Sequence, residues 1–296
     1  MQEKTSVALG SFDGVHRGHQ AVLQSALSFA REGLLPVVLL FDRHPLSVLR
    51  GTAPPALLEE NARTQMLRTM GFAVETVSFA AIHTLPPDAF VRQILCDRLH
   101  AGAVSCGFNY RFGRDGAGDA DTLRALCGER NIRLCVHEPV CEGGVPVSST
   151  TVRSLLEQGD VERANAMLGR AFSFSGTVIH GNENGRAFGF PTANTAYPQG
   201  LSVPRFGVYA TDAAVDGRTY RAITNIGIRP TISDTTLLCE THIPGMAIDL
   251  YGKTLTVSLR RFIRPEKQFA SLADVFKQVR QDLRTAYPSL QNGESL

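Results

Sequence analysis

The sequence predicts an α/β protein of two domains, a parallel-sheet domain at residues 1–168 and an antiparallel β-barrel domain at residues 169–296. In the first half, short apolar runs alternate five times with apolar residues at helical spacing, as in a doubly wound sheet. After residue 169, strand-like runs separated by Gly, Pro and Asn turns follow one another with little helix. One amphipathic helix at residues 271–287 ends this half, and we expect it to close the barrel.

The composition argues against several classes of protein. The 296 residues carry a net charge of +2, so no broad basic surface for nucleic acid is expected. No apolar run approaches the roughly 20 residues of a membrane span, and the N-terminus lacks the apolar core of a signal peptide. Six cysteines without a C-x-x-C pair favour free thiols in a reducing compartment. We therefore expect a cytoplasmic protein without nucleic-acid or membrane partners. The oligomeric state stays open, and a monomer is assumed.

The stretch VALGSFDGVHRGHQAVLQSAL, residues 7–27, predicts a strand, a glycine-bearing loop and a helix. Backbone N–H groups and the positive end of such a helix bind anions. His16 and His19 stand at the helix entrance, where imidazoles can donate hydrogen bonds to phosphate oxygens. An H-x-x-H pair can instead bind a metal, or belong to an ordinary surface turn. The chain lacks the P-loop pattern, and this loop is not G-x-G-x-x-G, so it belongs to neither of those phosphate-binding classes.

The alternation of strand and helix continues through the first half. We expect strands at residues 35–41, 74–79, 103–106 and 132–137, and helices at residues 61–70, 88–99 and 121–129. The first of these strands ends in FDRHP, which leaves Asp42 and His44 at the strand's carboxyl end. Open α/β sheets bind ligands at that edge, so both side chains can face a site there. A solvated turn is the alternative.

The segment CGFNYRFGRDGAGDADTL, residues 106–123, interrupts the alternation. Phe108, Tyr110 and Phe112 can supply stacking surface for a flat ring system, and Asn109 offers both a donor and an acceptor. The alternative is a buried loop in which the aromatic side chains only fill space.

A cluster of hydroxyl side chains at residues 148–151 precedes a predicted helix, and Arg153 lies one turn into that helix. Such residues cap a helix N-terminus. Hydroxyls, free N–H groups and a guanidinium at one helix end also form a clamp for a triphosphate.

The second half has its own motif, GNENGRAFGFPTANT at residues 181–195. Its Gly and Asn residues allow a tight loop against a ligand, and Pro191 fixes the entry to the last residues. The hydroxyl of Thr192 and the carbonyl of Asn194 are hard oxygen ligands that suit Mg²⁺. A β-hairpin loop with ordinary turn residues is the alternative.

These segments resemble known signatures. GSFDGVHRGH is similar to the H-x-G-H signature of the nucleotidyltransferase superfamily, in the form carried by bacterial flavin adenylyltransferases with a Rossmann-like domain. GFNYRFG and SSTTVR resemble two further blocks of that family, in the expected order. The segment at 181–195 resembles the riboflavin kinase block G-x-x-x-GR-x-x-G-x-P-T-A-N. The resemblance continues to the end of the chain through GVYA, NIGIRPT, ETHI, DLYG and RPEKQFASLADVFKQVRQDL.

This resemblance implies a bifunctional enzyme that makes flavin cofactors. Riboflavin is phosphorylated with MgATP to FMN, and FMN then reacts with a second ATP to give FAD and pyrophosphate. ATP is thus a co-substrate, Mg²⁺ a cofactor, and FMN both product and substrate. The resemblance implies that the catalytic residues are His16, His19, Arg153 and Glu240, the last as general base. In the first domain it implies that ATP is bound by Gly10, Phe12, Asp13, Gly18, Ser149 and Thr150, and flavin by Phe108, Asn109 and Tyr110. In the second domain it implies that ATP is bound by Gly181, Gly185, Arg186, Gly189 and Pro191, and Mg²⁺ by Thr192 and Asn194.

Two other interpretations remain. In the first, only one of the two activities is retained, and the other domain serves as a flavin-binding regulatory module. Two departures favour this interpretation: Gly116, where many relatives carry Arg, and Arg43, where relatives tend to carry Pro. Alternatively, the protein sequesters or senses flavin without catalysis. Intact Thr192, Asn194 and Glu240 argue against the latter, because a pure binder needs neither a magnesium site nor a base.

Overall fold

The computed structural model describes residues 3–180, 190–230, 235–246 and 249–288. The chain forms two compact units, Met1–Ser149 and Thr150–Leu296. They divide after the first residue of α7 (Ser149–Gln158) and before α8 (Val161–Leu168), whereas the sequence predicts a border after residue 168. α8 packs on the barrel, where Asn165 Nδ2 donates a hydrogen bond to the carbonyl of Leu259 at 2.8 Å. How far each domain extends along the chain stays a prediction.

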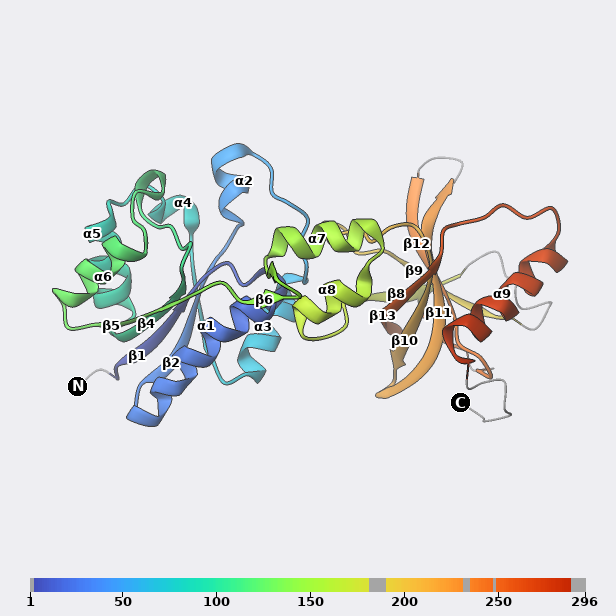
Figure 1. Cartoon of the computed structure of the whole chain (residues 1–296), viewed down its shortest axis with the longest axis horizontal. Helices are drawn as coiled ribbons and strands as arrows, with labels where there is room; N and C mark the ends of the chain where they lie inside the picture. Colours follow the sequence, from blue (N-terminus) through green and yellow to red (C-terminus); the bar gives the residue numbers. More distant parts are fainter. Residues whose placement is uncertain (1–2, 181–189, 231–234, 247–248, 289–296) are drawn as a thin grey trace. The chain divides into compact units, whose positions relative to one another are not determined.

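The first unit is built on a five-stranded parallel sheet of order β3-β2-β1-β4-β5 (Figure 1). The chain moves outward from β1 to β3 and then returns to the other side of β1 with β4, so the order reverses between β1 and β4. In open parallel sheets, ligands bind at the carboxyl ends of the strands beside such a reversal. The strands are β1 (Thr5–Leu9), β2 (Leu35–Phe41), β3 (Ala73–Val77), β4 (Ala101–Gly107) and β5 (Arg133–His137).

Helices cover both faces of this sheet (Figure 1). Side chains alternate between two hydrophobic clusters along each strand, because successive strand residues point to opposite faces. Ala8 belongs to the cluster under α1 (Arg17–Ser28) and α3 (Glu60–Thr69). Val7 and Leu9 belong to the opposite cluster. That cluster is covered by α5 (Pro87–Phe90), a π-helix (Val91–Arg98) and α6 (Ala120–Gly128).

Short elements connect the strands of the first unit. They are three 3-10 turns, Asp13–Val15, Phe29–Glu32 and Arg114–Gly116, two short helices, α2 (Pro45–Arg50) and α4 (Phe79–Ile82), and a hairpin of β6 (Cys141–Glu142) and β7 (Val145–Pro146).

The second unit contains a closed antiparallel barrel of order β10-β11-β12-β9-β8-β13, with β13 also paired to β10. A row of buried hydroxyls runs through it: Thr224 Oγ1 lies 2.9 Å from Thr211 Oγ1 and 3.0 Å from Thr241 Oγ1. The strands are β8 (Ser173–Ile179), β9 (Thr192–Ala196), β10 (Gly207–Val215), β11 (Arg218–Pro230), β12 (Thr235–His242) and β13 (Thr254–Arg264).

The C-terminal helix α9 (Leu272–Ala286) packs against β10, β11 and β13 (Figure 1). Ser271 caps its first turn, because the Ser271 hydroxyl accepts a hydrogen bond from the backbone N–H of Asp274 at 3.2 Å. At its end, the Tyr287 hydroxyl donates to the carbonyls of Thr211 and Ala222, at 2.6 and 3.0 Å. The helix is therefore attached to the barrel at its C-terminal end as well as capped at its start.

The predicted fold class is confirmed, although several elements differ from those expected. The helix expected at 88–99 consists of α5 followed by a π-helix. The strand expected at 74–79 ends at Val77, because Phe79 begins α4. β9 was not expected at all, since Pro, Thr and Asn at residues 191–194 are typical of turns. Within the described residues, no helix has the length and hydrophobicity that crossing a bilayer requires.

Candidate active sites

The loop after β1 has a strained backbone held by burial. Phe12 and Val15 have φ angles of 50° and 43°, in the left-handed region that few residues other than glycine adopt. Both side chains are buried, at 0% and 1% exposure. Such strain persists where the surroundings impose it, and it often marks a functional loop. Gly10 is needed for close approach, because a Cβ there would lie 3.2 Å from the Phe12 ring.

His16 caps α1 and orients His19. The backbone N–H of His19 donates a hydrogen bond to His16 Nδ1 at 3.2 Å. Neutral His16 therefore carries its proton on Nε2. The two rings stack, with centroids 3.6 Å apart and planes inclined by 13°. A Cβ at Gly18 would lie 3.2 Å from the His16 ring, so glycine leaves room for the ring. The structure thus brings together the two predicted histidines and Gly18.

The environment of His19 favours a neutral imidazole. Burial lowers the pKa of His19 well below its usual value, and electrostatic interactions with His16 and Arg63 lower it further. His19 Nδ1 is buried and makes no hydrogen bond within the described residues. A buried nitrogen without a partner is costly, and a bound ligand that supplies a partner relieves this cost.

Asp13 connects the loop to two other segments. Its carboxylate accepts a hydrogen bond from the backbone N–H of Leu57 at 2.8 Å, just before α3. Its carbonyl accepts a hydrogen bond from the hydroxyl of Ser149, the last residue of the first unit, at 3.0 Å. Thr150 and Arg153 belong to the second compact unit, and their approach to the phosphates of ATP stays a prediction.

The segment predicted to bind flavin presents two of its three residues to solvent. Phe108 is 48% exposed and Asn109 is exposed as well. Tyr110 instead packs on the core and stacks with Phe112, with centroids 5.9 Å apart. Burial raises the pKa of the Tyr110 phenol. The nearby Gly116 has a φ of 66°, in the left-handed region that favours glycine.

Asp42 and His44 have local structural contacts. Asp42 accepts a hydrogen bond from the backbone N–H of Phe79 at 2.9 Å, and this bond lowers the pKa of the Asp42 carboxyl. His44 Nδ1 accepts a hydrogen bond from the N–H of Leu46 at 3.1 Å and so caps α2. These contacts support the turn interpretation of the two residues.

In the second unit, strand register aligns Asn194, Glu240 and Asn225. Glu240 on β12 lies directly opposite Asn194 on β9 and opposite Asn225 on β11. Directly opposed residues on neighbouring strands point to the same face of a sheet. Thr192 lies two residues before Asn194 and opposite His242, so it shares that face. The predicted base and both predicted Mg²⁺ ligands are therefore neighbours on one surface of the barrel.

His242 extends this surface. Its Nδ1 lies 2.9 Å from the carbonyl of Pro191, which also holds the chain just before β9. Burial lowers the pKa of His242, although the bond to Pro191 partly raises it again. Pro191 is the one predicted ATP-binding residue of the kinase motif within the described residues. Gly181, Gly185, Arg186 and Gly189 lie outside them.

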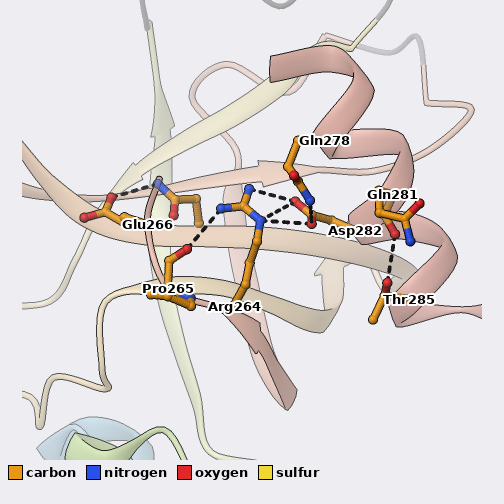
Figure 2. A network of polar contacts seen from close by, with 8 residues as sticks. Arg264, Pro265, Glu266, Gln278, Gln281, Asp282 and Thr285 are labelled. Atoms are coloured by element: carbon orange, nitrogen blue, oxygen red, sulfur yellow. Dashed lines mark hydrogen bonds and ion pairs between the residues drawn. The ribbon is translucent and has the colours of Figure 1, made fainter. Parts of the chain in front are cut away.

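A polar network joins the end of β13 and the residues that follow it to α9 (Figure 2). Arg264 donates to both carboxylate oxygens of Asp282 on α9, at 2.8 to 3.0 Å, and to the carbonyl of Pro265 at 3.0 Å. The next residue, Glu266, accepts a hydrogen bond from Asn225 Nδ2 at 3.2 Å. Asn225 is the register partner of Glu240. The network thus connects α9 to the row that contains the predicted base.

The donor set on the barrel suits Mg²⁺. This ion prefers oxygen ligands, and it commonly takes only one or two from the protein while phosphates and waters supply the rest. Asn194 is 7% exposed and Thr192 is exposed, both on the face of Glu240. No group of three or more His, Cys, Asp or Glu side chains suited to a metal occurs among the described residues.

Three residues near these surfaces were not singled out in the sequence. Asn225 lies in the NIGIRPT block, whose resemblance points to the block and not to a residue. Glu266 becomes visible only through its contact with Asn225. Arg63 Nη1 donates a hydrogen bond to the Ser11 carbonyl at 3.1 Å, across 52 residues of sequence. Contacts between segments so distant leave no local pattern.

Comparison with known proteins matches both halves of the chain. The family model described as FAD synthetase matches residues 1–151, and that described as riboflavin kinase matches residues 168–290. The bifunctional riboflavin kinase/FMN adenylyltransferase of Escherichia coli K12 is 36% identical over 294 residues, or 96% of this chain and 92% of that protein. The protein of the same name from Bacillus subtilis 168 is 33% identical, over 98% of this chain and 94% of that protein.

A solved structure also matches nearly the whole chain. It is the crystal structure of a protein from Streptococcus pneumoniae named as a macrolide-efflux protein, and it has a TM-score of 0.89 and 28% sequence identity. The match covers 97% of this chain and 94% of that chain. This similarity supports the fold, and the efflux name applies to the Streptococcus protein alone.

Proposed function

Because the chain belongs to the family of bifunctional riboflavin kinase/FMN adenylyltransferases, we propose that it phosphorylates riboflavin to FMN and then converts FMN to FAD. One observation carries this proposal. A single chain contains both a stacked His16–His19 pair at a helix entrance and a row of Asn194, Glu240 and Asn225 on a barrel. The first arrangement suits phosphate groups and the second suits activation of an alcohol beside a metal.

In the kinase reaction, Glu240 takes the proton from the primary hydroxyl of the ribityl chain. The hydroxyl oxygen attacks the γ-phosphorus of ATP, and ADP leaves. Thr192 and Asn194 hold Mg²⁺, which when bound neutralises charge on the phosphates. Asn225 lies opposite Glu240 on the neighbouring strand, and its hydrogen bond to Glu266 fixes this side of the surface on which Glu240 lies. Phosphoryl transfer asks mainly for such positioning and for charge neutralisation.

In the adenylyl transfer, an oxygen of the FMN phosphate attacks the α-phosphorus of ATP, and pyrophosphate leaves. The substrate is itself the nucleophile, so no protein nucleophile is required. Neutral His19 donates a hydrogen bond to the phosphates, and His16 holds the His19 backbone. Ser149, Thr150 and Arg153 contact the triphosphate from the start of α7. Phe108 and Asn109 contact the flavin. Each transition-state donor of this kind contributes about 10²–10³-fold to turnover.

The binding partners of the protein follow from the substrates of the two reactions. Riboflavin, FMN and ATP are the partners, and no protein partner is required by either reaction. The six cysteines, all within the described residues, form no disulfide, which supports a reducing compartment such as the cytoplasm.

The experiment that tests the proposal separates the two products. Purified protein is incubated with riboflavin, ATP and Mg²⁺, and riboflavin, FMN and FAD are resolved by chromatography over time. We expect FMN first and FAD afterwards, and neither product when Mg²⁺ is chelated. FMN without FAD, or FAD only from added FMN, would show that a single activity is retained. The absence of both products would contradict the proposal.

A further inference from the structure

Arg63 on α3 contacts the loop between β1 and α1, residues 10–16, through the carbonyl of Ser11. The start of α3 is held to the same loop. The carboxylate of Asp13 in the loop accepts the N–H of Leu57 at 2.8 Å, three residues before the helix begins at Glu60. Leu67, on the same helix, is 0% exposed in the cluster that also contains Phe12. These contacts hold α3 and the segment before it against the loop between β1 and α1. The position of Arg63 beside the loop is therefore built into the fold.

The guanidinium of Arg63 is only partly satisfied by the protein. Its Nη1 donates a hydrogen bond to the carbonyl of Ser11 at 3.1 Å. Its Nε is buried and has no hydrogen-bond partner among the described residues. No carboxylate among the described residues forms an ion pair with Arg63. By contrast, Arg17 in α1 is paired with Glu142 at 2.6 Å. A half-buried, uncompensated guanidinium calls for an anion.

A second unsatisfied nitrogen belongs to a side chain on which the charge of Arg63 acts. His19 Nδ1 is buried without a partner within the described residues, and the charge of Arg63 acts on the His19 ring. Neutral His19 can donate or accept a hydrogen bond, but it cannot neutralise a phosphate. Arg63 supplies the positive charge that His19 lacks. Two buried nitrogens without partners among the described residues, on side chains that interact electrostatically and one of them cationic, match an oxyanion with several oxygens.

We propose that Arg63 binds the phosphates of ATP in the adenylyl-transfer site, beside His19. This inference rests on the proposed function of the first unit. Arg63 neutralises charge that develops on the departing pyrophosphate, with its Nε and remaining N–H groups directed at phosphate oxygens. The hydrogen bond to Ser11 fixes the guanidinium before ATP arrives. Arg63 is then a substrate-contacting residue that no local motif of the sequence revealed.

Three full-length variants test this role. Arg63→Lys keeps the charge, Arg63→Gln keeps an N–H donor for Ser11 without the charge, and Arg68→Gln changes an exposed arginine on the same helix. The measurement is kcat and KM for ATP in FAD formation from FMN. We expect kcat/KM to fall about 100-fold in Arg63→Gln and about tenfold in Arg63→Lys. Arg68→Gln should match wild type, and riboflavin phosphorylation should be unchanged in all three.

A purely structural role gives a different pattern. If Arg63 only holds the Ser11 carbonyl, the Lys and Gln variants should perform alike, since both retain a donor. Equal kcat/KM values for these two variants would overturn the proposal, as would wild-type values for Arg63→Gln.

An equilibrium measurement separates this inference from the proposed function. Tripolyphosphate is titrated into each protein while the His19 ring is followed by NMR. Loss of the Arg63 charge should raise the pKa of His19 in free Arg63→Gln, and tripolyphosphate should bind at least tenfold more weakly than to wild type or Arg68→Gln. Equal affinities in all proteins would overturn the role of Arg63. A wild type that forms FMN but no FAD would instead contradict the adenylyl transfer, and the titration would still decide the role of Arg63.

Discussion

The two histidines of the first loop have different tasks, which their contacts define. His16 accepts the backbone N–H of His19 and so acts as a helix cap. His19 stacks on His16 and also contacts Phe12, with ring centroids 5.3 Å apart. These aromatic surfaces exclude water from one side of the His19 ring. Burial therefore keeps His19 neutral, and its charge state couples the stability of the loop to pH.

The first prediction concerns this coupling. The pKa of His19 is lowered in the folded protein, whereas in the unfolded chain it is about 6.5. Below pH 6.5 the unfolded chain binds a proton that the folded chain does not, so stability falls as the pH decreases. We expect a slope of up to about 1.4 kcal/mol per pH unit from this residue. Above pH 7.5 the residue contributes no slope.

His19→Gln tests the prediction, because it removes the titrating group and keeps a polar side chain. Urea unfolding of wild type and variant is followed by circular dichroism at pH 5.5 and 7.5. The stability difference between the two pH values should be smaller in the variant. An identical difference in both proteins would show that His19 does not titrate between the folded and unfolded states.

At the scale of elements, α9 is attached to the barrel by a buried ion pair next to the kinase surface. Arg264 at the end of β13 donates hydrogen bonds to both carboxylate oxygens of Asp282. The side-chain amide of Gln278 donates a further hydrogen bond to Asp282 at 2.9 Å (Figure 2). The side chain of Asp282 is only 3% exposed. Removing one partner of a buried pair leaves an uncompensated charge, which is far more costly than losing a surface pair.

The second prediction compares a buried pair with a surface pair of the same unit. Asp282→Asn should lower the free energy of unfolding by about 3 kcal/mol, because Arg264 loses its counter-charge. Asp216→Asn removes the pair with Lys253, whose side chains are 63% and 37% exposed. It should cost less than about 1 kcal/mol. Urea unfolding of both variants measures the difference, and similar losses in the two would contradict the role assigned to burial.

The third prediction concerns Gly227 on β11. The side chain of Glu266 lies against this glycine. A Cβ at this position would come within 2.6 Å of the Glu266 carboxyl carbon. Gly227→Ala should therefore displace Glu266 from Asn225 and reduce riboflavin phosphorylation roughly tenfold, as expected for a misplaced site. FAD formation from added FMN should stay at the wild-type rate.

A double variant provides the control for this clash. Combining Gly227→Ala with Glu266→Ala removes the carboxyl group that the new methyl would meet. Kinase activity of the double variant should equal that of Glu266→Ala alone. If the two losses simply add, the effect of Gly227→Ala has another origin.

At the scale of the whole molecule, local patterns in the sequence predicted both folds but not the contacts that complete the sites. The alternation of strand and helix around residues 7–137 is strong enough to indicate a parallel sheet. β9 escaped prediction because its residues are typical of turns, and only pairing with β12 makes them a strand. That pairing places Asn194 opposite Glu240, so the geometry of the kinase surface could not be foreseen without the register.

The same limit applies to the first unit. The H-x-G-H motif indicates the helix entrance, yet the stacking of His16 on His19 and the approach of Arg63 depend on how α3 packs. Arg63 lies 52 residues from Ser11 in the sequence, and nothing near it marks a phosphate site. The segment that contains Tyr110 predicts aromatic surface for a flavin, whereas burial assigns Tyr110 to the core. Tertiary packing, which no local pattern encodes, decides these cases.

The central claim is that one chain carries two chemistries in two separate sites, and a double dissociation tests it most directly. Glu240→Gln and His19→Gln are each supplied with ATP and Mg²⁺, once with riboflavin and once with FMN, and the products are resolved by chromatography. Glu240→Gln should form FAD from FMN at the wild-type rate while FMN formation falls at least 100-fold. His19→Gln should form FMN normally while FAD formation falls about 100-fold. Loss of both activities in either variant would contradict the account.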